Sequence, residues 1–278
     1  MKIPARYTVP VFIISLLLIS CTAVPLTGRH QLNFMPDSSM LAMSFQQYDK
    51  FLKSNKLSTD KQKTETVKRV GARIQKAVER YFSERRMSHK LDNYSWEFNL
   101  IESKDVNAWC MPGGKVVIYT GILPYTKDDA GLAVVMAHEI GHAVAKHGNE
   151  RMSQMLALQL GGVALSTALS ERPQETRKLW MTAFGLGAQF GFMLPYSRIQ
   201  ENEADHLGLI FMAMAGYDPH RAVPFWEEMS QKNEGKAPPE FMNTHPSDKT
   251  RIKNIKLLIP TAMKYYRRYK DVRSPVSS

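Results

Sequence analysis

The motif His138-Glu139-Ile140-Gly141-His142 constrains this chain more than any other feature. It follows small and apolar residues over 130–137, which predicts a buried helix that continues through the motif. Residues four apart share a helix face at about 5–6 Å, so both histidines can direct their imidazoles at one metal ion. Imidazole nitrogens favour Zn²⁺, and we expect one ion per chain in a four-coordinate site with one open position. The alternative is a pair of hydrogen-bonded core histidines.

Glu139 has the position of a catalytic base. It projects about 100° around the helix from His138, close to the metal without ligating it. The spacing therefore predicts metal-assisted hydrolysis, in which Glu139 takes the proton of the attacking water.

A second helical segment offers the third metal ligand. Glu201 and Asp205 are four apart on a face that we expect to be buried, and the small Ala204 and Gly208 allow close approach to the first helix. We expect Glu201 to bind the metal and Asp205 to hydrogen-bond a ligand imidazole. Glu203 lies about 200° from Glu201 and is expected to point outward. The alternative places all three acids on an exposed surface.

The N-terminus resembles a bacterial lipoprotein signal. A basic start precedes an apolar run over 11–20, too short for a membrane helix of roughly 20 residues, which predicts a signal peptide over 1–20. Leu18-Ile19-Ser20-Cys21 is typical of a lipobox, so Cys21 is expected to carry lipid. Thr22, in place of Asp, favours the outer membrane and a protein that faces the periplasm. The alternative is an ordinary signal peptide with an incidental Cys21.

The remaining chain reads as one α+β domain. Residues 21–37 contain turn-forming Pro and Gly and are expected to form a tether, and residues 38–278 a single domain. Helical spacing over 64–86, alternation over 94–101 and an apolar run over 115–120 predict helices, a small sheet and then helices. With 44% hydrophobic and 23% charged residues, the composition excludes a disordered chain.

Two apolar runs, 155–169 and 180–194, lie between the two metal-binding segments. A transmembrane hairpin is one interpretation, but each run is short for about 30 Å of hydrocarbon. We favour a helical hairpin that packs beside the active site or covers it.

The chain is basic, with 37 Lys and Arg against 26 Asp and Glu and a net charge of +11. The tail over 249–273 combines basic residues with tyrosines, as nucleic-acid-binding patches do. Because a lipoprotein signal places the chain outside the cytoplasm, we expect no nucleic acid partner. Anionic lipid or lipopolysaccharide is a more plausible contact, and a solvated basic helix is the simplest interpretation.

Several motifs together resemble a known family over about 107–251. The sequence is similar to the zinc metallopeptidases that include the CAAX prenyl endopeptidases and the HtpX heat-shock protease, particularly their periplasmic lipoprotein branch with BepA and LoiP. The matching motifs are Asn107-Ala108, Pro112-Gly113-Gly114, Tyr119-Thr120-Gly121, His138-Glu139-x-x-His142, His147-Gly148, Ser197-Arg198, Glu201-x-x-x-Asp205 and Thr244-His245-Pro246.

The resemblance implies a mainly helical zincin-like domain with a small sheet beside the H-E-x-x-H helix, and Glu201 as the third zinc ligand. It also implies that an exposed edge strand binds the substrate backbone, here at Asn107, Ala108, Trp109 and Cys110. A plain interior strand is the alternative. The sequence departs from its relatives at Trp109-Cys110-Met111, where they carry Phe-Ala and another apolar residue.

His245 has three interpretations: a turn histidine, a group that stabilises the transition state, or an inhibitory fourth zinc ligand. We favour the inhibitory ligand by a small margin. Arg198 and Arg251 are weaker candidates to bind neighbouring carboxylates.

The predicted function is a lipid-anchored zinc endopeptidase of the bacterial cell envelope. The resemblance implies misfolded or stalled envelope proteins as substrates, with the membrane contacted through lipid on Cys21. The alternative is a chaperone or assembly factor for outer-membrane proteins that cuts rarely. The intact motif favours the peptidase, because a binding protein has no need of Glu139.

Overall fold

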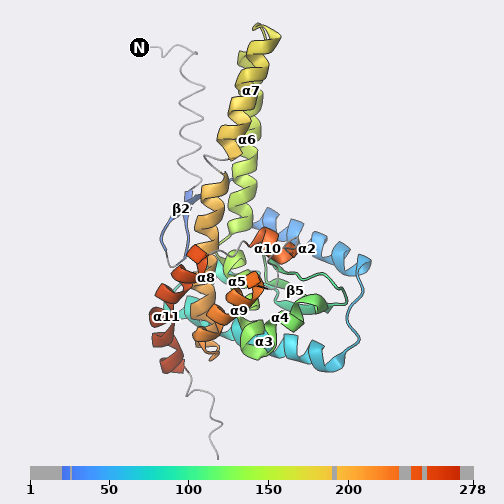
Figure 1. Ribbon diagram of the computed structural model, residues 1–278, viewed down its shortest axis with the longest axis vertical. Helices are drawn as coiled ribbons and strands as arrows, with labels where there is room; N and C mark the ends of the chain where they lie inside the picture. Colours follow the sequence, from blue (N-terminus) through green and yellow to red (C-terminus); the bar gives the residue numbers. More distant parts are fainter. Residues whose placement is uncertain (1–20, 26, 190–192, 232–238, 246–248, 270–278) are drawn as a thin grey trace, which may run out of the picture. The chain divides into compact units, whose positions relative to one another are not determined.

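The computed structural model describes residues 21–25, 27–189, 193–231, 239–245 and 249–269. The predicted signal peptide over 1–20 lies outside the described residues. The chain divides into two compact units, the first formed by residues 1–40 and 146–198 and the second by residues 41–145 and 199–278. Each unit is described by itself below (Figure 1).

The second unit contains a three-stranded sheet in the order β3 (Glu97–Ile101), β5 (Lys115–Tyr119) and β4 (Ala108–Met111). β3 runs parallel to β5, and β4 runs antiparallel to it. The turn between β4 and β5 requires glycine, because Gly113 and Gly114 have φ values of +88° and +85°. A Cβ at Gly114 would also lie 2.6 Å from the ring of Trp96.

Helices cover this sheet and make up most of the unit. α3 (Lys61–Glu84) begins at Asp60, whose carboxylate accepts a hydrogen bond from Lys63 N, and packs against β3. α5 (Asp129–Val144) contacts both α3 and β4. The other helices with residues in this unit are α2 (Asp37–Ser54), α4 (Leu123–Thr126), α8 (Leu194–Met214), α9 (Ala222–Gln231), α10 (Glu240–Thr244) and α11 (Lys249–Tyr269).

The α+β fold class is therefore confirmed: the domain is mainly helical, with a small sheet beside the helix that carries the H-E-x-x-H motif. Burial explains why α5 does not show a strongly amphipathic pattern. Every residue from Gly131 to Val144 is buried, so the helix has no solvent face that would require charges.

The first unit joins the N-terminal segment to a helical hairpin. β1 (Cys21–Ala23) pairs antiparallel with β2 (His30–Leu32), and α6 (His147–Ala168) is followed by α7 (Gln174–Ala188). Arg29 donates to both carboxylate oxygens of Glu150 at 2.6 and 2.8 Å, and Glu150 is fully buried. The segment expected to be a tether thus contains a strand pair that is bonded to the first turn of α6.

The expectation that the hairpin packs beside or over the active site stays a prediction, because the two features belong to different units. Beyond Gln154, the apolar side chains of α6 are exposed or half-buried, and none of the residues of α7, all of which are described, is buried. Among the described residues, no helix combines the length and the apolarity needed to cross a membrane.

Candidate metal centre

Glycine allows α5 and α8 to approach closely enough to form one site. A Cβ at Gly208 would lie 3.0 Å from the backbone N of His138, and a Cβ at Gly141 would lie 3.0 Å from the carbonyl oxygen of Ala204. The same face of α8 carries Glu201, two turns before Gly208. The close packing therefore brings Glu201 to the histidines of α5, as the small residues predict.

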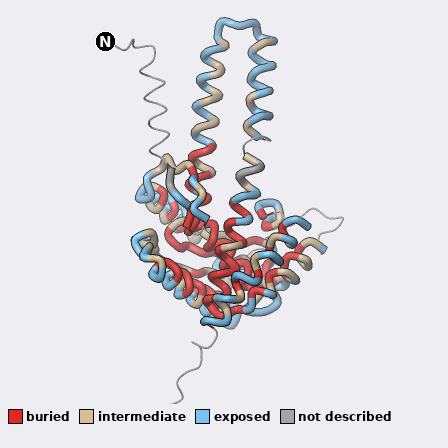
Figure 2. The backbone as a smooth tube through the Cα atoms, turned by 90° about the vertical axis from the view of Figure 1, so that its left-hand side faces the viewer, coloured by how far each residue is buried: buried red, intermediate tan, exposed pale blue. Residues whose placement is uncertain are grey.

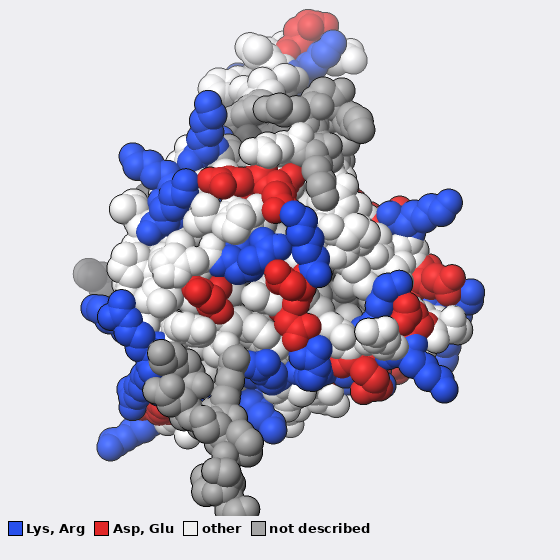
Figure 3. Space-filling view, turned by 60° about the horizontal axis from the view of Figure 1, so that its bottom comes forward, with Lys and Arg blue, Asp and Glu red and all other residues white. Residues whose placement is uncertain are grey.

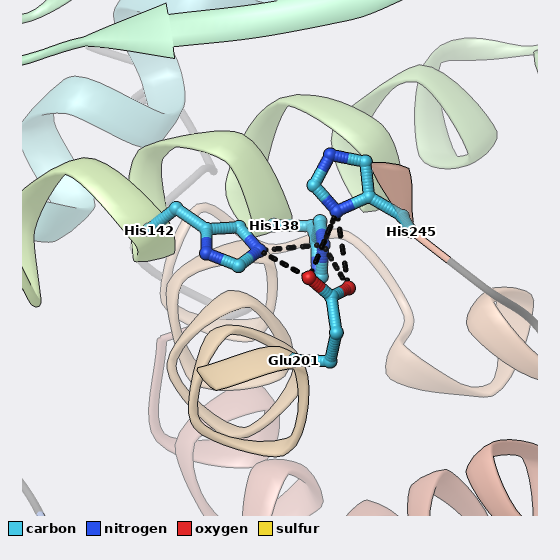
Figure 4. A group of neighbouring side chains, drawn as sticks. All are labelled: His138, His142, Glu201 and His245. Atoms are coloured by element: carbon cyan, nitrogen blue, oxygen red, sulfur yellow. Dashed lines mark hydrogen bonds and ion pairs between the residues drawn. The ribbon is translucent and has the colours of Figure 1, made fainter. Parts of the chain in front are cut away.

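Four side chains meet at this crossing, each with one ligand atom, and these atoms all lie within 4.8 Å of one another (Figure 4). The Nε2 atoms of His138 and His142 are 3.1 Å apart. His245 reaches the group from the loop after α10, with its Nδ1 3.1 Å from Nε2 of His138 and 3.0 Å from the carboxylate of Glu201. All four residues are at most 8% exposed: His138, His142, Glu201 and His245.

The donor set fits a zinc ion. Zinc bonds to nitrogen and oxygen are about 2.0–2.2 Å long, and the edges of a tetrahedron with such bonds measure about 3.3–3.6 Å. The observed separations of 3.0–3.3 Å between neighbouring ligand atoms are close to this value. Three imidazole nitrogens and a carboxylate are borderline donors of the kind that zinc binds in proteins.

Asp205 and Arg251 form hydrogen bonds that hold the candidate ligand His138 in place. Nδ1 of His138 lies 2.9 Å from Oδ1 of Asp205, which orients the ring so that Nε2 faces the cluster. The guanidinium of Arg251 donates to both oxygens of Asp205 at 2.8 and 2.7 Å, and it lies 3.6 Å from the centre of the Trp226 ring. Asp205 therefore lies against the imidazole of His138, and its role in orienting a metal ligand stays a prediction.

Arg251 also reaches the other side of the cluster. Its Nη1 lies 3.2 Å from Oε2 of Glu201 and donates to the backbone carbonyl of His245 at 3.2 Å. Arg251 is 5% exposed, whereas Arg198 is exposed. One buried guanidinium thus links Glu201, Asp205 and the loop that carries His245. The sequence signal for this role was weak, because Arg251 lies 46 positions beyond Asp205.

The charges of the cluster shift its protonation equilibria. Burial alone would raise the pKa of Glu201, but His142, His138 and His245 hold that pKa well below its usual range. Burial also opposes ionisation of Asp205, yet Arg251 and His138 lower its pKa. For His138, burial and Arg251 favour the neutral ring, while Asp205 and Glu201 outweigh them and raise the pKa. Both carboxylates are therefore ionised and suited to a cation.

Glu139 lies beside the cluster without joining it. It is 4% exposed, and its Oε1 is 3.3 Å from Nε2 of His245. Burial, and then the charge of Glu139, raise the pKa of the Cys110 thiol. The carboxylate of Glu139 is therefore close to His245 and acts electrostatically on Cys110 of strand β4.

Strand β4 is one of the two edge strands of the described three-stranded sheet, with α5 against it. Of the four residues predicted for substrate binding, Ala108, Trp109 and Cys110 belong to β4 and Asn107 precedes it. Trp109 packs edge-on against the ring of Phe51 at 4.8 Å, on the face of the strand opposite to Cys110. The Trp109 ring is therefore directed away from Glu139.

The prediction that Glu203 points outward is wrong. Glu203 is 5% exposed, and Ala204 and Leu207 on the same helix are fully buried. The helical angle between Glu201 and Glu203 was correct, but this part of α8 passes through the interior of the second unit. A helix surrounded by other elements has no outward side.

Comparisons with known proteins agree with this geometry. The family model described as Peptidase family M48 matches residues 68–259, which include the whole cluster. The mitochondrial metalloendopeptidase OMA1 of Schizosaccharomyces pombe is 37% identical over 174 residues, or 62% of this chain and 49% of that protein. The OMA1 of Arabidopsis thaliana is 36% identical over 180 residues, covering 65% of this chain and 35% of that protein.

A bacterial relative is similar over the same region. The beta-barrel assembly-enhancing protease of Escherichia coli is 29% identical over 161 residues, covering 56% of this chain and 33% of that protein. The chain thus spans half or less of the length of these relatives. The family match covers more than half of the present chain, and the chain belongs to peptidase family M48.

Proposed function

We propose that this protein is a zinc-dependent endopeptidase of the bacterial cell envelope. The observation that carries the proposal is the buried cluster of His138, His142 and Glu201, with the carboxylate of Glu139 beside it. A purely structural cluster would not need Glu139, a buried carboxylate that is not among the four grouped ligand residues.

Each residue of the site has a separate role in the proposed reaction. When bound by His138, His142 and Glu201, zinc would supply a Lewis acid that activates water and polarises a carbonyl. Glu139 would accept the proton of the attacking water and return it to the leaving amine. Asp205 would keep the His138 ring oriented, and Arg251 would hold Asp205 in turn.

We propose that His245 is an inhibitory ligand. Its Nδ1 lies among the donor atoms, so it would fill the fourth position that catalysis requires to be open. Helix α10, which precedes His245, is hydrogen-bonded near the proposed substrate strand, because Phe241 N donates to the carbonyl of Val106 at 3.1 Å. Movement of α10 would therefore release His245 and the start of β4 together. Stabilisation of the transition state by His245 is the other interpretation.

The cellular setting follows from two lines of support. The lipobox ending at Cys21 favours a lipid anchor and the periplasmic side of a membrane, and the identity of Thr22 favours the outer membrane. The printed name of the Escherichia coli relative refers to beta-barrel assembly, whereas the OMA1 relatives are mitochondrial by name. We propose misfolded or stalled envelope proteins as substrates, with β4 binding their backbone as an added strand.

The same printed name favours a second candidate function, a chaperone or assembly factor that cuts rarely. Cleavage of an unfolded protein by purified wild type and Glu139→Gln separates the two. The peptidase proposal expects both proteins to bind one zinc, with activity lower by roughly 10²–10⁴-fold in the variant. Glu65→Gln, on the exposed face of α3, is the matched control and should cleave normally. Equal rates for wild type and Glu139→Gln would contradict the mechanism.

A further inference from the structure

The α6–α7 hairpin exposes large apolar side chains along both helices. Figure 2 shows α6 changing from buried at its start to intermediate and exposed further along. The six most exposed large apolar residues of the hairpin range from 52% to 69% exposure: Met155, Leu160, Val163, Leu179, Trp180 and Leu186. Soluble proteins rarely leave so many large apolar side chains together in water, so this surface requires a partner.

The charge pattern indicates what kind of partner it is. Residues 152–170 and 179–197 contain no Asp, Glu, Lys or Arg, whereas residues 171–178 between them contain two acidic and three basic residues. Arg151 and Arg198 lie at the outer ends of the two uncharged stretches. A helix that faces water normally carries charges along its solvent side, and these two helices carry them only at their ends.

The packing between α6 and α7 argues against a role in which one of these helices binds in a groove of a protein partner. A Cβ at Gly161 would lie 3.2 Å from the ring of Phe184, and a Cβ at Gly162 3.6 Å from it, so the two helices already use these faces against each other. The exposed apolar residues lie on the remaining sides. A groove in a protein partner covers one stripe of a single helix, whereas a lipid surface can accept the exposed apolar sides of both helices at once.

We propose that the α6–α7 hairpin is immersed in the surface of a lipid bilayer. It lies along the interface, with the charged turn over 171–178 and the exposed Arg198 among the headgroups and the apolar sides against the acyl chains. This placement needs neither helix to cross the membrane, in keeping with their length and composition. Basic residues of the turn would meet lipid phosphates.

This proposal stands independently of the lipid on Cys21 and of peptidase activity. If Cys21 is acylated, however, the two membrane contacts belong to the same unit. The ion pair between Arg29 and the buried Glu150 connects the N-terminal segment to the start of α6. A lipid anchor and the hairpin would then act together on one membrane, which strengthens attachment without any new contact.

Trp180 provides a local test, since it is 55% exposed on α7. The full chain is reconstituted into phosphatidylethanolamine and phosphatidylglycerol vesicles that contain phospholipid with brominated acyl chains, and co-flotation verifies that it is bound. Bromine quenches only nearby tryptophans. We expect a quenched component of the emission in wild type that is absent in Trp180→Phe. Equal quenching of the two proteins would overturn the proposal.

A charge placed on the hairpin gives a matched second test. Leu179 on α7 and Leu257 on α11 are both 69% exposed. We expect Leu179→Glu to reduce the quenching of Trp180 several-fold and Leu257→Glu to leave it unchanged. Equal quenching in both variants would contradict the proposal. If hairpins of two copies pair instead, Trp180 should be shielded before vesicles are added and stay unquenched by brominated lipid, which would also overturn it.

Discussion

The close approach of α5 and α8 at Gly208 leads to a prediction about metal affinity. In Gly208→Ala the added Cβ would start 3.0 Å from His138 N and 3.1 Å from both the carbonyl carbon of Ala137 and the Cα of His138. These are backbone atoms of a buried helix, so they cannot rotate out of the way. The two helices must separate by a few tenths of an ångström for the contacts to reach ordinary lengths.

That separation is large for a metal site. Ligand distances vary by about 0.2 Å in well-formed sites, and Glu201 is carried by the helix that must move. We expect zinc affinity to fall by roughly 10–100-fold, the range observed when the support of a ligand is disturbed. Overpacking costs about 1–3 kcal/mol, and the better helix propensity of Ala returns about 1 kcal/mol. The metal-free protein should therefore lose about 0–2 kcal/mol of unfolding free energy.

The assay is a zinc competition titration with a chelating indicator, combined with urea unfolding of the metal-free protein. Gly185→Ala is the matched control, because a Cβ there meets nothing within 4 Å. It should keep wild-type affinity and gain up to about 1 kcal/mol of stability. If Gly208→Ala binds zinc as tightly as wild type, the close packing of the helices does not set the geometry of the site.

The remaining predictions concern single residues. Zinc content of purified variants should fall to none in Glu201→Ala and stay at one per chain in Glu203→Ala; equal contents would contradict the ligand assignment. His245→Ala should retain zinc and cleave an unfolded substrate faster, whereas a loss of roughly 10²-fold would show that His245 stabilises the transition state. Mass spectrometry should find an acylated N-terminus at Cys21, and an unmodified Cys21 would refute lipidation. The pKa of His138 is raised above its usual value of 6.5 in the metal-free protein, so protons should compete with zinc for this ring at pH values above 6.5. As the pH is lowered, zinc affinity should therefore begin to decline above pH 6.5. A decline that begins only below pH 6 would contradict this prediction.

Local periodicity made the grouping of these side chains predictable from the sequence. The spacing of His138 and His142 is a property of any helix, and the small residues at Ala204 and Gly208 identified the face that carries Glu201. Asp205 followed from the same face. These inferences needed no knowledge of the tertiary fold, because each depends on residues at most seven positions apart.

The features that were missed depend on long-range packing. The direction of Glu203 is decided by the elements around α8, and Arg251 reaches Asp205 from 46 positions away. The exposure of the hairpin was also not foreseen, because an apolar run has the same sequence whether protein or lipid covers it. The burial or exposure of these residues can be determined only from the tertiary structure of each unit.

A crystal structure of the zinc-loaded protein, with anomalous data at the zinc edge, tests the central claim most directly. The account predicts one zinc ion per chain at bonding distances of about 2.0–2.2 Å from Nε2 of His138, Nε2 of His142 and the carboxylate of Glu201. Glu139 should lie near the ion without binding it. A zinc ion bound elsewhere, or one that Glu201 does not contact, would contradict the account.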